Sequence, residues 1–555
     1  MSGETAIALK GRFAFEKDTI RRKMLKKNNK QNLGIAALIV MSSMVFSRLT
    51  GFIRDALVTN LGTYNADTLN TGFAATNIMY NLLIGGAIAA ALIPILSSYI
   101  MKNDEKEGWK AIGTFINVTF LASIIFCIIG CIFAPQLVSL LGQNYSPQKV
   151  NTTINITRIL FPSVAFLMLA GLTNGVLYSY KRFSSAAYGP VVYNLGAIVS
   201  ILVFRNSSVE KVALGIMCSS FIYFIFQLVF ALKDMKFYQF KLALKNAGFI
   251  RLYKLAIPSL IASSIVQINA LISQSYTSYY NGGSVTAFVN ANNIWQLPYG
   301  IFAMGVGAAI LPTLSEKLAL GDMDSFKNII TKSLKNIFLL TVPAAVAFIV
   351  IGVPIVSAIY KWTSRFEASQ ITNTSNILLF FTIALFGQSI LAIITRAFYA
   401  LNDTRTPLYF SAGSILLNGF ACYIFFKTTS LQAAGMSLAY SISSAFYATS
   451  LIYILNKKIK GLYLRDLLSF FTKTMVASII MGIVIFILNK AIPINFKEVF
   501  TLRLKISELC VLAFEILVGG GCYCAVVYFM KIEEARYLLD ITYKKIIGLK
   551  KKLLK

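Results

Sequence analysis

Histidine is missing from this chain of 555 residues, and acidic residues are scarce, at 22 against 52 lysines and arginines. Without imidazole groups, neither histidine metal ligation nor histidine acid–base catalysis is available. Only 13% of the residues are charged whereas 57% are hydrophobic, which excludes a soluble globular protein. The formal net charge of +30 could suggest nucleic acid. However, the basic residues lie between apolar runs, a placement typical of membrane orientation, so no nucleic-acid partner is expected.

Catalytic and metal-binding patterns are missing as well. There is no nucleophile elbow, no Gly-rich phosphate loop with a lysine, and no HExxH or paired CxxC. We therefore expect no enzyme, metal or cofactor, and any transport would depend on an ion gradient, the membrane potential or the substrate gradient. No cleavable signal is expected in residues 1–32. The seven cysteines lie in or beside apolar runs and are interpreted as small hydrophobic residues.

Apolar stretches of about 20 residues recur along the chain, each long enough to cross a hydrocarbon core of about 30 Å. They predict an all-α polytopic membrane protein with about fourteen transmembrane helices. The expected spans are residues 34–60, 72–100, 111–134, 153–180, 187–204, 211–232, 253–279, 284–315, 333–358, 375–400, 407–426, 432–455, 471–489 and 506–530.

Positive residues alternate between the connections. Residues 1–32 carry nine Lys or Arg, the connection 61–70 carries none, and residues 233–254 carry six. This alternation predicts that both termini are cytoplasmic. One loop argues against it, because residues 490–505 would be external and yet hold four basic residues.

An internal repeat divides the chain. Residues 91–97 (ALIPILS) return as 309–315 (AILPTLS), and Asn77-Ile78 returns as Asn293-Ile294. The offset equals six predicted helices, an even number, so the copies point the same way and predict parallel repeats with a site between them. Coincidental similarity among apolar helices is the alternative.

The expected domains are a basic cytoplasmic tail (1–32), an N-lobe (33–232), a cytoplasmic amphipathic linker on the inner leaflet (233–252), a C-lobe (253–455), two further helices (456–530) and a basic cytoplasmic C-terminal tail (531–555).

A charged cluster interrupts the first predicted helix at Arg48, Arg54 and Asp55. Charges inside a span are expensive and are retained where they face a water-filled cavity or a polar ligand. Arg48 and Asp55 share a helix face, so a structural pair between them is the alternative. Asp67 falls in the short predicted outer loop, where a solvated turn residue is the alternative to a functional acid.

Amide side chains occupy equivalent places in the two halves. The second predicted helix presents Asn77 and Asn81, and the eighth presents Asn293 and Gln296 beside Asn290 and Asn292. Such a lining could hydrogen-bond sugar hydroxyls, amides or phosphate oxygens. Asn and Gln also hold membrane helices together, so a packing role is the alternative.

Several of these segments, taken together, resemble the MurJ/MviN family of lipid II flippases. The similarity rests on the Ser47–Asp55 cluster, Ala66-Asp67, Pro94-x-Leu-Ser, Thr157–Pro162 and Gln296–Gly300. It implies two six-helix lobes around a cationic cavity and two terminal helices that line a groove for a polyprenyl tail. It also implies that Arg48, Arg54, Asp55 and Asp67 are functional, and that the protein moves a lipid-linked peptidoglycan precursor from the inner to the outer leaflet.

The chain departs from the family pattern at several polar positions. Tyr80 and Asn81 stand where the family usually has two arginines, Gly85 replaces an acid, and Asn292-Asn293 replaces an Asp-Arg pair. Because arginine binds phosphate oxygens bidentately, the expected cavity is less positive and richer in amides. In the leading hypothesis, a lipid II flippase working by alternating access, Arg48 and Arg54 hold phosphate and Asp55 and Asp67 position or gate them.

Three other functions stay open at this point. The first is a flippase for another polyprenyl-linked oligosaccharide, such as a capsule or exopolysaccharide unit. The second is a cation-coupled small-molecule exporter, although the related multidrug antiporters usually have twelve helices. The third is a non-transporting scaffold. The expected partners are a lipid-linked glycan and membrane lipids, with cell-wall synthesis proteins as candidates.

Overall fold

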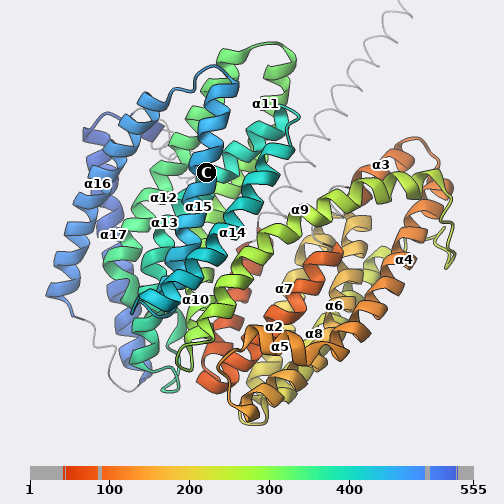
Figure 1. Ribbon diagram of the computed structural model, residues 1–555, viewed down its shortest axis with the longest axis horizontal. Coiled ribbons are helices and arrows are strands. Elements are labelled where there is room, and N and C mark those ends of the chain that lie inside the picture. Colours follow the sequence, from red (N-terminus) through yellow and green to blue (C-terminus); the bar gives the residue numbers. More distant parts are fainter. Residues whose placement is uncertain (1–41, 44, 85–90, 494–499, 533, 536–555) are drawn as a thin grey trace, which may run out of the picture.

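The computed structural model describes residues 42–43, 45–84, 91–493, 500–532 and 534–535, and every regular element within these ranges is helical (Figure 1). Eleven of the helices in the described ranges are long and apolar enough to cross a membrane. The all-α polytopic class is therefore confirmed. The number fourteen stays a prediction, because the helix through 45–59, α2 (Thr63–Ile84) and α9 (Ala247–Thr277) lie at predicted positions but are not among the eleven.

The N-lobe is the group of helices drawn from red to yellow in Figure 1. It comprises the helix through 45–59, α2, α3 (Ile93–Met101), α4 (Glu105–Ile132), α5 (Ala134–Leu141), α6 (Pro147–Ser179), α7 (Phe183–Phe204) and α8 (Val209–Ala231). Helix α6 contacts α2, α4 and α8. Buried side chains such as Phe161 and Met168 of α6 fill the space between them, so α6 is the central helix of this lobe.

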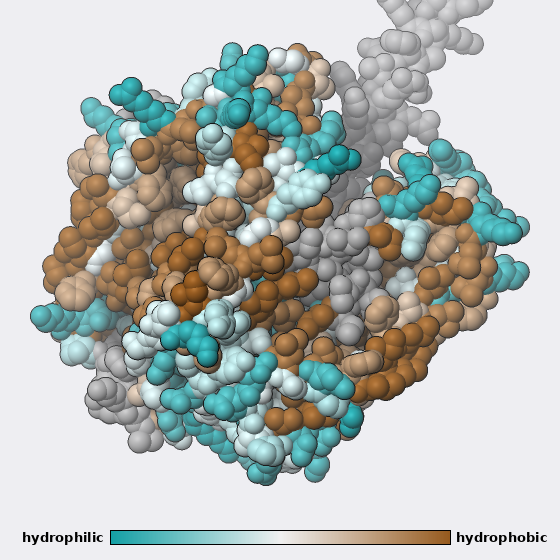
Figure 2. Space-filling model, in the orientation of Figure 1, coloured by the Kyte–Doolittle hydropathy of each residue, from teal (hydrophilic) through white to brown (hydrophobic). Residues whose placement is uncertain are grey.

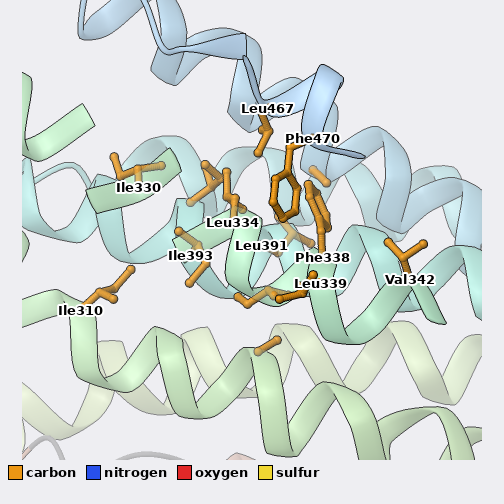
Figure 3. Close-up of a cluster of buried hydrophobic side chains, with 14 of the residues drawn as sticks. Ile310, Ile330, Leu334, Phe338, Leu339, Val342, Leu391, Ile393, Leu467 and Phe470 are labelled. Carbon is orange, nitrogen blue, oxygen red and sulfur yellow. The ribbon is translucent and has the colours of Figure 1, made fainter. Parts of the chain in front are cut away.

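The C-lobe begins with α9, which also contacts α2 and α4 of the N-lobe. It continues with α10 (Ser284–Pro298), the π-helix η2 (Tyr299–Met304), α11 (Gly305–Ala319), α12 (Met323–Tyr360), α13 (Ala368–Ala400), α14 (Arg405–Thr428) and α15 (Ala433–Lys458). Its core is a cluster of buried side chains, and Figure 3 shows Leu334 and Phe338 of α12 lying beside Leu391 of α13.

Helices α16 (Leu464–Ala491) and α17 (Leu502–Phe529) pack on the outer side of the C-lobe. Phe470 of α16 points at Phe338 in Figure 3. Only 22% of the most apolar window of α17 is buried within the protein, so most of that helix faces lipid. The groove for a lipid tail expected along these two helices stays a prediction.

The start of α2 differs from the prediction. The chain turns at residues 60–62, where Gly62 has a φ of +93°, a left-handed conformation that glycine adopts without a steric penalty. Helix α2 therefore begins at Thr63, nine residues before the expected 72. The loop placement of Asp67 was wrong, and so was the alternative of a solvated turn residue, because Asp67 lies in the first turns of α2 with 1% of its surface exposed.

The linker between the lobes is held against α4. The side-chain amide of Asn117 donates to the carbonyls of Gln239 and Lys241, at 3.1 and 3.0 Å, and Thr114 accepts from the backbone N–H of Ala243. Residues 233–246 form turns and extended backbone that expose apolar side chains, Phe240 among them. Its place on the inner leaflet stays a prediction.

The surface carries the pattern of a membrane protein. Figure 2 shows hydrophobic side chains over the middle of the visible face and hydrophilic ones gathered mainly toward its upper and lower ends. Large apolar side chains remain exposed on several helices, with Leu416 at 76% and Leu517 at 74%. So continuous an apolar surface is unfavourable in water, so lipid surrounds the apolar middle of the molecule.

Candidate functional site

A polar cavity of about 530 Å³ lies between the two lobes. Its walls come from the helix through 45–59, α2, α6, α7 and α8 on one side and from α9 and α10 on the other. The polar lining residues are Arg54, Asp55, Asn70, Asn77, Tyr80, Tyr193, Tyr223, Gln267, Gln274, Asn292 and Asn293. Arg54 and Asp55 are the charged members of this lining, so its formal charges cancel.

Arg54 and Asp55 form the polar centre of the cavity. The guanidinium of Arg54 donates to Asp55 Oδ1 from Nε at 2.9 Å and from Nη2 at 2.7 Å. Its Nη1 donates to Asn194 of α7 at 3.0 Å. About a quarter of each charged side chain stays exposed, 25% for Arg54 and 22% for Asp55. The pair is therefore partly accessible to water in the cavity.

Asp55 also joins the two lobes. Its second oxygen, Oδ2, accepts a hydrogen bond of 2.9 Å from the side-chain amide of Asn293 on α10. One turn further along, Thr59 donates to Asn290 at 3.1 Å. Asn293 thus lines the cavity, whereas the buried Asn290 serves packing between the lobes.

The structure separates the two arginines that were predicted to act together. Arg48 is exposed and does not line the cavity. Its guanidinium lies against Gly300 of η2, where a Cβ atom would stand 3.0 Å from Nη2. Asp55 bonds to its neighbour Arg54, so the structural pair with Arg48 that was the alternative is not formed.

The remaining predicted residues divide as well. Asn77 lines the cavity, whereas Gln296 is half-buried and lies outside the lining. The side chain of Asn81 lies outside the described residues. Whether the residues in the cavity bind a ligand stays a prediction.

Asp67 holds the N-terminus of α10, about one helical turn from Asn70, which lines the cavity. Its Oδ2 accepts from the backbone N–H of Gly283 at 2.7 Å, and its Oδ1 accepts from the N–H and the hydroxyl of Thr286 at 3.0 and 2.7 Å. Free N–H groups at a helix start attract a carboxylate. Gly283, with a φ of +91°, turns the chain into α10, and a Cβ there would come within 3.1 Å of Thr63. We call this contact of Asp67 with Gly283 and Thr286 the latch.

Lys149 is a functional candidate that sequence reasoning missed. It lies in the first turns of α6, and its ammonium group is 2.9 Å from Asp67 Oδ2. The side chains are almost fully buried, with 10% of Lys149 and 2% of Asp67 exposed. A buried acid requires a nearby cation, but the sequence placed Asp67 in a loop and gave no sign that its side chain is buried.

Further contacts join the lobes at the same end. The side-chain amide of Asn60 donates to the carbonyl of Tyr360 at 2.6 Å, and Thr363 donates to Asn60 Oδ1 at 2.9 Å. Asn70 donates to Thr286 at 3.1 Å. Helix α2 contacts α10 and α5 contacts α9, whereas α3 and α11 stand apart at the upper end of Figure 1. The lobes are thus joined at one end of the molecule.

This arrangement suits the binding of a polar group. The cavity offers amides, phenols and one arginine, and the described residues hold no cluster of acids, cysteines or histidines able to bind a metal. One end is held by hydrogen bonds that a relative rotation of the lobes would break. A polar group enclosed between two lobes in this way can be exposed to either side in turn.

Comparisons with known proteins agree on one family. The family profile described as lipid II flippase MurJ matches residues 58–506. The probable lipid II flippase MurJ of Rickettsia prowazekii is 24% identical over 502 residues, covering 89% of this chain and 97% of that protein. The corresponding protein of Rhizobium meliloti is 28% identical over 495 residues, covering 84% and 88%.

Solved structures show the same fold. A lipid II flippase MurJ in an inward closed conformation superposes with a TM-score of 0.73 at 23% identity, covering 89% of this chain and 99% of that one. An inward-facing multidrug resistance MATE transporter of the MOP superfamily gives a TM-score of 0.64 at 16% identity, covering 76% and 98%. The second match covers less of this chain than the first.

Proposed function

The chain belongs to the MurJ family of lipid II flippases, and we propose that it moves lipid II, the undecaprenyl-pyrophosphate-linked peptidoglycan precursor, from the inner to the outer leaflet of a bacterial plasma membrane. The observation that carries this proposal is the family profile over most of the chain. The polar cavity between the two lobes, which the latch joins at one end, supports it. No covalent step is required, so the protein works as a transporter rather than an enzyme.

The proposed mechanism is alternating access. With both termini in the cytoplasm, the latch lies at the outer face and the upper ends of the lobes in Figure 1 face the cytoplasm. The head group enters the cavity from inside while the latch is closed. Rotation of the lobes then breaks the bonds of Asp67 to α10 and opens the cavity outward. The polyprenyl tail stays in lipid beside α16 and α17, which bury little of their surface.

Arg54 is the residue that would meet the pyrophosphate. Its donors already hold a carboxylate oxygen in two hydrogen bonds, and a phosphate oxygen can replace that acceptor. Asp55 would then keep Asn293 as its partner, so that cargo binding changes the contact between the lobes. The amides and phenols of the lining would contact the sugars and the peptide.

The energy source is also a proposal. The head group carries negative charge. Moving one elementary charge across the membrane changes its free energy by about 2.3 kcal/mol per 100 mV of membrane potential. Coupling to that potential or to an ion gradient would supply the driving force, with no cofactor. Cell-wall synthesis proteins that use the delivered precursor are candidate partners.

The test is lipid II accessibility at the outer face of cells that depend on this protein alone. Wild type should deliver lipid II, and the Arg48→Ala/Arg54→Ala variant should not, at equal membrane levels. The matched control is Arg205→Ala/Lys211→Ala, which removes two exposed positive charges at the proposed outer end of the N-lobe and should transport normally.

Two outcomes would contradict the proposal. Well-expressed wild type that leaves lipid II inside would point to another polyprenyl-linked glycan as cargo. Full transport by the double arginine variant would show that Arg54 does not hold the pyrophosphate, and that Arg48 outside the cavity does not replace it.

A further inference from the structure

We propose that Lys149 is the positioning residue of the latch, because it makes the burial of Asp67 between the lobes favourable. It also couples the latch to a second contact between the lobes, that of residues 143–144 with the end of α9. The two contacts therefore form and break together. This proposal rests on the alternating-access function above. It goes beyond that function by naming what sets the equilibrium between the closed and open latch.

The first step concerns charge. Asp67 and Lys149 both belong to the N-lobe, so their ion pair of 2.9 Å survives when the lobes separate. The closed latch buries both side chains, whereas an open latch would expose them to water. A buried charge without its partner is strongly unfavourable. Removing Lys149 should therefore raise the free energy of the closed latch far more than that of the open one.

The second step concerns how Lys149 is held. Its ammonium group lies 3.9 Å from the centre of the Tyr145 ring and 5.9 Å from that of Tyr64. Aromatic faces attract a cation at such distances. The Tyr145 hydroxyl shares a hydrogen bond of 2.8 Å with Thr71 of α2. The cation is thus fixed between two rings and the carboxylate.

The third step connects Lys149 to a separate contact between the lobes. Tyr145 follows Gln143 and Asn144, two residues that form hydrogen bonds with the end of α9. The backbone N–H of Gln143 donates to the hydroxyl of Ser278 at 2.8 Å, and Asn144 donates to the carbonyl of Tyr279 at 3.2 Å. Through Tyr145, a shift of Lys149 affects this contact as well as the latch.

The experiment measures the distance across the latch in the full chain, reconstituted in lipid nanodiscs without cargo. Spin labels are placed at two exposed positions, Gln148 in the N-lobe and Asn281 in the C-lobe, in a background whose seven native cysteines are replaced. The readout is the ratio of long to short distances. It does not depend on transport or on the cargo, so a failure here is distinguishable from a failure of the proposed function.

Lys149→Met should raise the open-to-closed ratio about tenfold or more, because a buried acid loses its cation. Lys149→Arg should keep the ratio within about threefold of the parent, since the charge remains. Asp67→Asn should also raise it, and Asp67→Asn/Lys149→Met should lie below either single variant because neither charge is left unpaired. Tyr145→Leu, which keeps both charges, should raise the ratio less than Lys149→Met.

The matched control is Lys211→Met, an exposed lysine at the same end of the N-lobe, which should leave the ratio unchanged. An unchanged ratio in Lys149→Met and Tyr145→Leu would overturn the proposal. So would a double variant whose ratio is the product of the two single effects, because Lys149 would then not act through Asp67.

Discussion

Two acid–base pairs of the N-lobe, Arg54–Asp55 and Lys149–Asp67, both contact α10 of the C-lobe, and they differ in their access to water. Asp55 keeps 22% of its side chain exposed and gives one hydrogen bond acceptor to Asn293. Asp67 keeps 2% exposed and accepts three hydrogen bonds from α10. An acid–base pair is therefore suited to two different roles. The partly exposed Arg54–Asp55 pair can exchange a partner for a ligand, whereas the buried Lys149–Asp67 pair holds the two lobes together.

The largest effect should come from removing the exchangeable cation. We expect Arg54→Ala to lower lipid II delivery about 30-fold or more, because losing one partner of a hydrogen-bonded charge pair costs about 2 kcal/mol at least. Delivery is measured as lipid II accessible at the outer face, at matched protein levels. Arg205→Ala is the control, and undiminished delivery by Arg54→Ala would show that Arg54 does not hold the cargo.

The second prediction compares the two acids directly. Asp67→Asn should raise the open-to-closed ratio across the latch about tenfold, because it leaves the buried Lys149 without a partner. Asp55→Asn should change that ratio about threefold or less, since water reaches Arg54. Spin labels at Gln148 and Asn281 report both variants. Equal effects of the two substitutions would remove the distinction between the pairs.

The third prediction concerns the link from the cavity to α10. Asn293→Ala should lower lipid II delivery about three- to tenfold, because the Asp55 carboxylate loses one hydrogen bond from a neutral amide while its ion pair with Arg54 remains. The measurement is initial delivery rate in the same cells. A loss as large as that of Arg54→Ala would mean that Asn293 itself holds the cargo.

The smallest effect is expected at a third acid, Asp403, between α13 and α14. Burial opposes its charge, but hydrogen bonds from Lys458 and Thr406 outweigh burial and lower its pKa from 3.8 to about 2. Its stabilising contribution is therefore complete above about pH 4 and is lost as the pH falls through about 2. Asp403→Asn should cost about 1 kcal/mol or less.

The shift in unfolding temperature that Asp403→Asn causes should be constant between about pH 5 and 8, where the carboxylate is charged throughout. Thermal unfolding of the purified protein at several pH values checks it. A shift that grows or vanishes within that range would contradict the assigned pKa.

Much of the architecture could be predicted from the sequence, because membrane spans reveal themselves by length and apolarity alone. The polar centre was also predictable in part: a charge inside a span implies a cavity, and Arg54 and Asp55 line one. The arginine that pairs with Asp55 could not be predicted. Helix periodicity favours Arg48, seven residues away, whereas in the structure Asp55 pairs with its neighbour Arg54.

The latch was beyond sequence reasoning for a physical reason. Asp67 and its cation Lys149 are 82 residues apart and meet when the N-lobe folds, and Gly283 reaches Asp67 only when the two lobes pack. The helix start at Thr63 was hidden too, because residues 63–71 are too polar to read as membrane and are stabilised by contacts with the other lobe.

The most direct test is to lock the latch reversibly and follow transport. Asn70 and Thr286 face each other across it with 3.1 Å between their side-chain atoms, so Asn70→Cys/Thr286→Cys in a cysteine-free background should form a disulfide under oxidation. Oxidation should stop lipid II delivery by the double cysteine variant, and reduction should restore it. Delivery by each single cysteine variant should not respond to oxidation. Delivery that continues in the cross-linked protein would contradict alternating access through this end.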